Sequence, residues 1–362
     1  MNVACALVMV LVLSLVALAT WAHLRYWTRR LLVTMPYAST EELVTPDGAT
    51  IVLRRIGLPT APLAPERAPV LLVHGLGANH RNNDLDPEFS LARHLQARGH
   101  DVWLLTLRSG RPTRGAARRA VRFESMVLHD LPVAIAAVRE RTGAASIDYL
   151  GFSMGGMLLY GALGRAVPEA WLRRVVVCGS PGIVGVARPL RRWLRRLPRA
   201  LVPGAPLRLA ARLFAFASEW FRTPFHGVTV NPRNVPPGLT RSALVNLVED
   251  IPAALNADFA AFSAVGEARV GGVSTLAGLA TVTVPALFIA GSVDNLAPVR
   301  SVRRAFDAWA AERPETPKRF VPFGRAYGHA EDYGHGDLAF GKHVATEIFP
   351  VIEGFLAEQP LV

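Results

Sequence analysis

The chain has 362 residues, 51% hydrophobic and 19% charged, a composition typical of a folded globular protein rather than a disordered one. Its two cysteines, Cys5 and Cys178, each lie in an apolar run, which argues against a disulfide framework or a cysteine metal site. The net charge of +12 is concentrated: residues 108–122 hold six arginines and no acid, and residues 181–241 hold eleven arginines and one acid. Subtracting these excesses of six and ten leaves −4 for the remainder, so we expect no nucleic-acid partner.

An apolar stretch opens the chain. Residues 3–22 carry no charge and are long enough for a helix to cross a bilayer of about 30 Å. Three arginines follow within residues 25–30 and no Lys or Arg precedes the stretch, which is atypical of a secretory signal. By the positive-inside rule we expect residues 1–30 to be a single-pass anchor with a basic flank, and the rest of the chain to be cytoplasmic. The alternative is a signal cleaved near Ala19, which would make the protein secreted or periplasmic.

Strand and helix patterns alternate after the anchor. Residues 41–57 predict a hairpin with Asp47-Gly48 in its turn. The other expected elements are strands at 69–75, 101–107, 146–153, 174–180, 285–292 and 318–324, and helices at 88–98, 123–142, 154–166 and 337–357. This alternation predicts a doubly wound, mostly parallel α/β sheet. Residues 181–280 are proline-rich, basic and largely helical, and we interpret them as a cap insertion between two halves of one core, residues 41–180 and 281–362.

The strongest chemical signal is the sequence GFSMGG at residues 151–156. It closes a predicted apolar strand and opens a helix, the context in which a G-x-S-x-G turn exposes a nucleophile, here Ser153. The sequence His74-Gly75-Leu76-Gly77 ends another strand, and strand ends of a parallel sheet share one crevice. Backbone N–H groups of this loop, with that of the residue after Ser153, are candidates to bind a developing oxyanion. We interpret His74 as a residue that shapes the loop.

A serine nucleophile needs a base and an acid that orients the base. Asp294 follows the strand 285–292, and its alternative role is to cap a helix near residue 299. His329 and His335 both follow the last strand, where the base of a Ser-Asp-His order is expected. Asp337 lies two residues after His335, where it can cap the final helix, which favours His335 and leaves His329 in reserve. Two histidines six apart do not match a helical metal-ligand pair, so we expect no metal and no cofactor.

The chain resembles the α/β-hydrolase superfamily and its acid-lipase branch in particular. The resemblance rests on three segments and covers about residues 70–180 and 284–357: SLARHLQARGHDVWLLTLRSG (90–110), HDLPVAIAAVRERTG (129–143) and GHGDLAFGKH (334–343). It implies Ser153 as nucleophile, Asp294 as acid, His335 as base, and the backbone amides of Leu76 and Met154 as oxyanion donors. More distantly, GFSMGG is similar to polyhydroxyalkanoate synthase and depolymerase relatives, although those synthases carry cysteine at the position of Ser153.

The chain departs from the lipase pattern in several places. Phe152 stands where the lipases have histidine, the Arg-Gly loop reads RSGRPTRG, and the insertion 181–280 matches no family we can name. The resemblance implies a serine hydrolase of carboxylic esters, and the apolar anchor favours a lipophilic ester. An acyltransferase, a polyester depolymerase and a non-catalytic membrane scaffold remain alternatives, because fold alone does not fix function. Within the insertion, residues 188–201 predict a basic amphipathic helix that either contacts a membrane or packs on the core as an ordinary cap helix.

Overall fold

The centre of the molecule is an eight-stranded sheet of order β1-β2-β4-β3-β5-β6-β9-β10. The computed structural model describes residues 3–57, 67–113, 115–185, 202–220 and 224–357. β2 pairs antiparallel with β1 and β4, and the other neighbours in this sheet are parallel. The strands are β1 (Ser39–Val44), β2 (Thr50–Arg55), β3 (Val70–Val73), β4 (Val102–Thr106), β5 (Ile147–Phe152), β6 (Leu172–Cys178), β9 (Ala286–Gly291) and β10 (Lys318–Phe323). The predicted doubly wound α/β sheet is confirmed.

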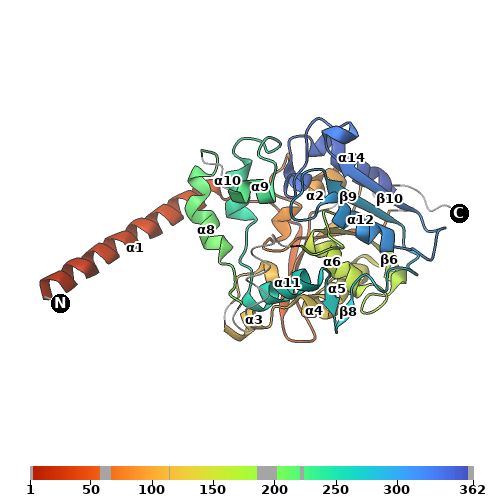
Figure 1. Cartoon of the computed structure of the whole chain (residues 1–362), viewed down its shortest axis with the longest axis horizontal. Helices are drawn as coiled ribbons and strands as arrows, with labels where there is room; N and C mark the ends of the chain where they lie inside the picture. Colours follow the sequence, from red (N-terminus) through yellow and green to blue (C-terminus); the bar gives the residue numbers. More distant parts are fainter. Residues whose placement is uncertain (1–2, 58–66, 114, 186–201, 221–223, 358–362) are drawn as a thin grey trace.

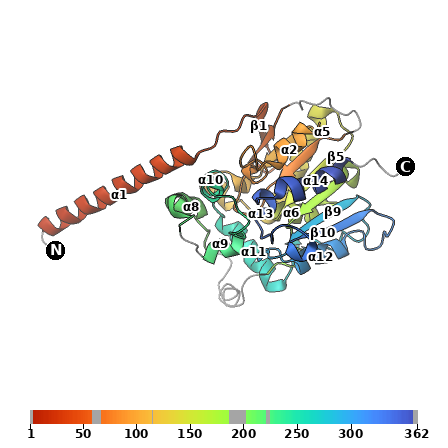
Figure 2. The same cartoon turned by 90° about the horizontal axis from the view of Figure 1, so that it is seen from above.

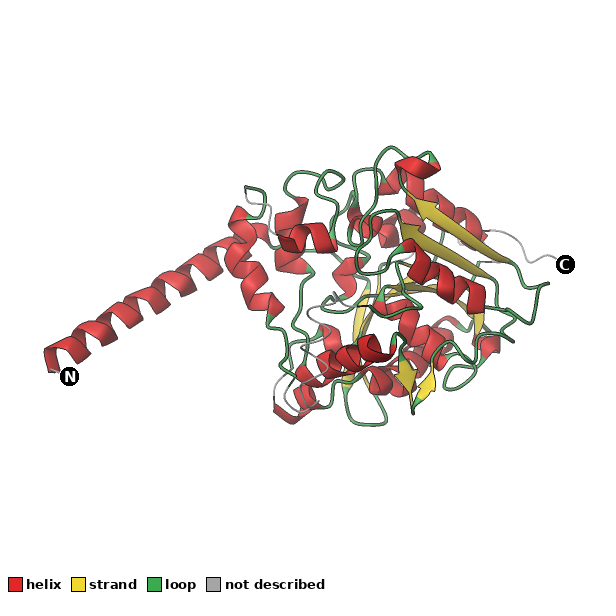
Figure 3. Cartoon of the chain, viewed as in Figure 1, coloured by secondary structure: helices red, strands yellow, loops and turns green. Residues whose placement is uncertain are grey.

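Helices cover both faces of this sheet (Figure 3). Successive strand side chains point to opposite faces, so the apolar strands feed two separate cores. In β3, Leu72 packs into the core that includes α2 and α14, whereas Leu71 packs into the core that includes α5, α6 and α12. These helices are α2 (Leu91–Ala97), α5 (Leu131–Thr142), α6 (Met154–Ala162), α12 (Val299–Ala308) and α14 (Val344–Ala357). Burial on both faces explains why the strands read as continuous apolar runs.

One of the expected helices is continuous and another is interrupted. The helix predicted at 123–142 consists of α4 (Phe123–Ser125), a π-helical turn (Met126–Asp130) and α5. The helix predicted at 337–357 is divided into α13 (Asp337–Phe340) and α14. The division lies at Gly341, which leaves the helical conformation and whose N–H still bonds to the carbonyl of Asp337. The apolar periodicity revealed neither the π-helical turn nor the break at Gly341.

The insertion after β6 lies between the N-terminal helix and the sheet in Figures 1 and 2. Its described helices are α8 (Leu207–Phe214), η6 (Ala215–Ala217), α9 (Pro224–Thr229), α10 (Leu239–Asn246) and α11 (Ala253–Val265), followed by the small hairpin β7 (Arg269–Val270) and β8 (Val273–Ser274). It is joined to the core by a hydrogen bond of 2.8 Å from the N–H of Glu249 to the carbonyl of Gly77. The basic stretch 188–201 lies outside the described residues, and the division of the chain into domains stays a prediction.

The N-terminal helix α1 (Val3–Leu31) projects from the body of the molecule (Figures 1 and 2). From Cys5 to Leu31 it is long and apolar enough to cross a membrane, and its most apolar window is not buried against the rest of the protein. An N-terminal signal sequence has the same properties, so length and composition agree with both readings of this segment.

Candidate active site

Ser153 lies at a sharp turn between β5 and α6. Its backbone torsions are φ 53° and ψ −116°, a conformation that costs free energy for a residue with a Cβ and persists only where the surroundings enforce it. A hydrogen bond of 2.8 Å from its N–H to the carbonyl of Cys178 fixes the turn against β6. The result is a serine held at the carboxyl edge of the sheet, at the start of a helix.

The glycines on either side of Ser153 are needed because other backbone comes too close. A Cβ on Gly151 would lie 2.4 Å from the backbone nitrogen of Gly156, and one on Gly155 would lie 2.6 Å from the carbonyl oxygen of Val73. Both distances are far below van der Waals contact and involve backbone that cannot move aside. The G-x-S-x-G spacing is therefore a packing requirement of this turn.

His335 connects Ser153 to Asp294. Its Nε2 lies 2.9 Å from the Ser153 Oγ, and its Nδ1 lies 2.7 Å from the Asp294 Oδ2. The loop after β9 carries the aspartate and the loop before α13 carries the histidine, so three separate strand ends supply the three side chains. His335 and Asp294 are both buried, whereas Ser153 remains partly exposed.

The carboxylate of Asp294 is fixed on both oxygens. Its Oδ1 accepts hydrogen bonds from the backbone N–H groups of Leu296 at 2.8 Å and Ala297 at 2.7 Å, while Oδ2 faces His335. Burial by itself would raise the pKa of Asp294, but the facing imidazole and these N–H donors outweigh it, so the pKa lies below its ordinary value. The N-cap position of α12 is occupied by Pro298, so the alternative role for Asp294 does not apply.

The other histidine of the same loop lies elsewhere. The ring of His329 packs against Phe323 with 4.4 Å between ring centroids, and its Nδ1 lies 3.2 Å from the carbonyl oxygen of Gly324. The structure therefore brings His335, and not the reserve candidate His329, to Ser153. The sequence had favoured His335, with His329 in reserve.

The loop after β3 lies directly beside the serine. A Cβ on Gly75 would be 3.0 Å from the Ser153 Cβ. Among the described residues, none accepts a hydrogen bond from the backbone N–H of Leu76 or of Met154, which leaves both donors available. His74 is fully buried, its Nε2 accepts a hydrogen bond from the N–H of Leu107, and burial lowers its pKa to about 4. A neutral histidine that joins two strand ends fits the structural role expected of it.

The sequence had led us to expect that Asp337 caps the final helix, but in the structure it does not. It is the first residue of α13 and its carboxylate is fully buried. The carboxylate accepts hydrogen bonds of 2.9 Å from the N–H of Gly334, the N–H of Asn231 and the Nδ2 of Asn234. Burial raises the pKa of Asp337 to about 6, against the lowering effect of these donors. The side chain thus fastens the loop of His335 to the insertion.

A buried ion pair joins two of the lipase-like segments. Arg108, in the segment 90–110, donates from Nε to the Asp130 Oδ1 at 2.7 Å, and Asp130 opens the DLP sequence of the segment 129–143. Both side chains are almost completely buried. The same guanidinium bonds Asp47 in the turn of the β1–β2 hairpin. These two segments therefore carry a structural contact that sequence reasoning had missed.

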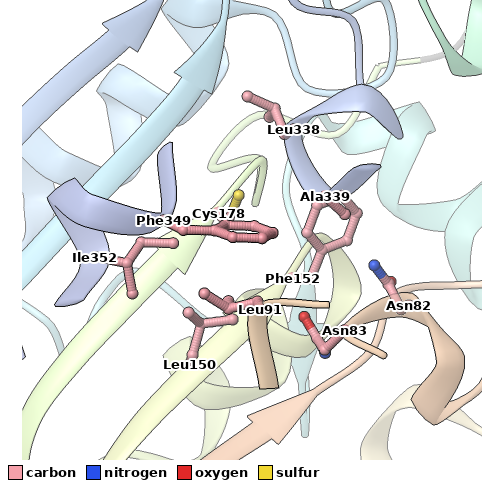
Figure 4. Close-up of a pocket in the computed structure, with 10 residues that line it drawn as sticks. All are labelled: Asn82, Asn83, Leu91, Leu150, Phe152, Cys178, Leu338, Ala339, Phe349 and Ile352. Carbon is pink, nitrogen blue, oxygen red and sulfur yellow. The ribbon is translucent and has the colours of Figure 1, made fainter. Parts of the chain in front are cut away.

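The cavity in Figure 4 lies behind the nucleophile turn. It is lined mainly by apolar side chains, among them Phe152, Cys178 and Leu338, and measures only about 10 Å³. That is about the space of one water molecule, so this cavity is too small for an acyl chain. The ring of Phe152 also packs edge-on against His335, with 5.2 Å between centroids. Among the described residues, no three His, Cys, Asp or Glu side chains gather in a way that could hold a metal ion.

Comparison with known proteins gives one family match and three similar proteins. The family model for the alpha/beta hydrolase fold matches residues 68–339. A gastric triacylglycerol lipase from Homo sapiens is 33% identical over 126 residues, which cover 32% of this chain and 31% of the lipase, so the chain matches about a third of that relative's length. A thermophilic esterase from Thermogutta terrifontis has a similar fold, with a TM-score of 0.55 and 16% identity over 88% of this chain and 98% of the esterase. A monoacylglycerol lipase from Paleococcus ferrophilus also has a similar fold, with a TM-score of 0.55 and 16% identity over 84% of this chain and 98% of the lipase.

Proposed function

Because the chain belongs to the alpha/beta hydrolase fold family, we propose that it is a membrane-anchored serine hydrolase that cleaves lipophilic carboxylic esters. One observation carries the proposal: the unbroken sequence of contacts from the Ser153 Oγ through the His335 imidazole to the Asp294 carboxylate, at 2.9 and 2.7 Å. A hydroxyl, an imidazole and a carboxylate in this order are the groups that nucleophilic acyl transfer requires.

The reaction begins when His335 takes the proton of Ser153 and the oxygen attacks the ester carbonyl. Asp294 holds the imidazole so that Nε2 faces the serine, and it stabilises the imidazolium that forms. The N–H groups of Leu76 and Met154 bind the developing oxyanion. His335 then protonates the leaving alcohol, and water repeats the sequence on the acyl-enzyme to release the acid and regenerate Ser153.

Two observations support an ester of lipidic character. The similar proteins include a triacylglycerol lipase and a monoacylglycerol lipase, whose names give acylglycerols as their substrates. The apolar helix α1 supports a location where such esters are found, because its unburied window can span a bilayer. We place the folded domain on the cytoplasmic side, since three arginines follow the apolar stretch within residues 25–30.

Labelling by a fluorophosphonate probe tests the proposal without knowledge of the substrate. The purified full chain should react covalently, Ser153→Ala should not, and the matched variant Ser125→Ala, which changes a serine at the end of α4, should react like the wild type. Hydrolysis of a medium-chain p-nitrophenyl ester should follow the same pattern and release free acid. Undiminished labelling or turnover in Ser153→Ala would disprove the mechanism.

A further inference from the structure

The last part of α1 is packed against the insertion. The Nε2 of His23 lies 3.0 Å from the carbonyl oxygen of Leu213 at the end of α8, and its ring meets that of Phe216 in η6 edge-on at 4.9 Å. Trp27, one helical turn further, also lies against Phe216, with 5.9 Å between centroids. After α1 ends, Asn246 of α10 holds the chain by accepting from the N–H of Val33. The helix is therefore attached to the insertion from about residue 23 onward.

This attachment fixes where a bilayer must lie, if α1 is the anchor in the proposed function. The apolar residues 3–22 form a helix about 30 Å long, which the hydrocarbon core of one bilayer fills completely. The membrane surface then falls near His23. Because Leu213 and Phe216 touch His23, the end of α8 and η6 lie at the depth of the lipid headgroups.

Two large exposed aromatic side chains adjoin these contacts. Phe214, the last residue of α8, is 65% exposed, and Trp220, whose ring packs edge-on against Phe216 at 6.1 Å, is 67% exposed. Arg241 lies over the Trp220 ring at 5.5 Å, so an aromatic ring and a cation are presented together. Aromatic side chains of this kind concentrate where membrane meets water. The described residues 202–220 and 224–241 of the insertion hold four arginines against one acid, a charge that suits anionic headgroups.

We propose that Phe214 and Trp220 form a lipid-contacting face that inserts into the headgroup region of an anionic phospholipid leaflet. The membrane thus contacts the insertion as well as the anchor. α8 joins this face to the candidate site: the Cδ1 of Leu207, its first residue, lies 3.4 Å from where a Cβ on Gly77 would be. An eight-residue helix is only about 12 Å long. An ester held in the leaflet therefore lies one short helix away from the loop beside Ser153.

Activity on two forms of substrate tests this face. Full-length protein is reconstituted into vesicles of phosphatidylcholine and phosphatidylglycerol (roughly 3:1, within the range of anionic surfaces). The double variant Phe214→Ser/Trp220→Ser should lose about tenfold in kcat/KM for a fluorogenic ester embedded in the vesicles and keep its activity on a soluble p-nitrophenyl ester. Val273→Ser is the matched control, because Val273 is 49% exposed on β8, far from α1 in Figure 1. Equal rates on the embedded ester for both variants would overturn the proposal.

Depth measurements separate this proposal from that of the anchor. A bimane label is attached at Phe214→Cys or, as control, at Val273→Cys, in a Cys5→Ser background, since Cys5 is exposed and Cys178 is buried. Quenching by doxyl-labelled lipid should be several times stronger at position 214. If the protein floats with the vesicles but both labels are quenched equally, the lipid-contacting face is wrong and the anchor stands. If the protein does not float, the anchor fails and this inference fails with it, while fluorophosphonate labelling of Ser153 still decides the chemistry.

Discussion

Replacement of Asp294 by asparagine should stop catalysis by fixing the wrong tautomer of His335. In the wild type, Oδ1 accepts two backbone N–H bonds, at 2.8 and 2.7 Å, and Oδ2 accepts from the imidazole. The asparagine oxygen must stay with the two N–H groups, since the flipped amide would leave two buried donors unpaired at about 1–3 kcal/mol each. Its NH₂ group then donates to Nδ1, so Nε2 carries the proton and cannot accept the one from Ser153. We expect kcat to fall by about 10⁴-fold, or ~5.5 kcal/mol of transition-state stabilisation.

Steady-state hydrolysis of a p-nitrophenyl ester measures this loss. Circular dichroism and thermal unfolding of Asp294→Asn should remain close to wild type, because the variant keeps the size and most of the hydrogen bonds of the carboxylate. Asp307→Asn is the control: this carboxylate is half exposed and pairs with Arg303 at the surface. A folded Asp294→Asn enzyme that retained a tenth or more of wild-type kcat would refute the argument, because the imidazole would then not depend on this carboxylate.

Three further outcomes are expected. Gly155→Ala should destabilise the fold by about 3 kcal/mol in chemical denaturation, whereas Gly278→Ala, with open space around its Cβ, should be close to neutral. Burial raises the pKa of Asp337 from 3.8 to about 6, so the free energy of unfolding should be highest below pH 4 and should fall as the pH rises through 6 and this buried carboxyl group ionises. In Asp337→Asn this fall should be smaller by ~3 kcal/mol between pH 4 and 7. Parallel plots of the unfolding free energy against pH for the wild type and the variant would contradict this. His335→Ala should abolish ester hydrolysis and His329→Ala should retain most of it, and the reverse would overturn the assignment of the base.

The fold could be predicted because its strands are short, apolar and separated by clear helix patterns. DVWLLTL and PALFIAGS read as buried strands, and the sheet places them as β4 and β9. The nucleophile turn was also visible in the sequence, since its glycines are needed where a Cβ would come within 3 Å of another backbone segment. These features depend only on residues adjacent in the chain or on burial, and both can be predicted from the local sequence pattern.

The remaining parts depend on contacts between distant segments. Both His329 and His335 follow β10, and only the path of the loop brings His335 to Ser153. The anchoring of Asp337 involves Asn231 and Asn234, about a hundred residues earlier in the insertion, and no local pattern connects them. The break at Gly341 within the predicted last helix was missed because apolar periodicity continues through it.

The two edges of the sheet have a consequence at high protein concentration, where neighbouring molecules meet often. β10, at one edge, contains Pro322, which has no N–H, and opens with the charged residues Lys318 and Arg319. β1, at the other edge, carries Glu41 and Glu42, which pair with arginines from other parts of the chain. Pro322 interrupts the row of backbone donors on β10, and the glutamates place charged side chains along β1; both features disfavour pairing with a second sheet. The protein is thereby protected against edge-to-edge aggregation at high local density.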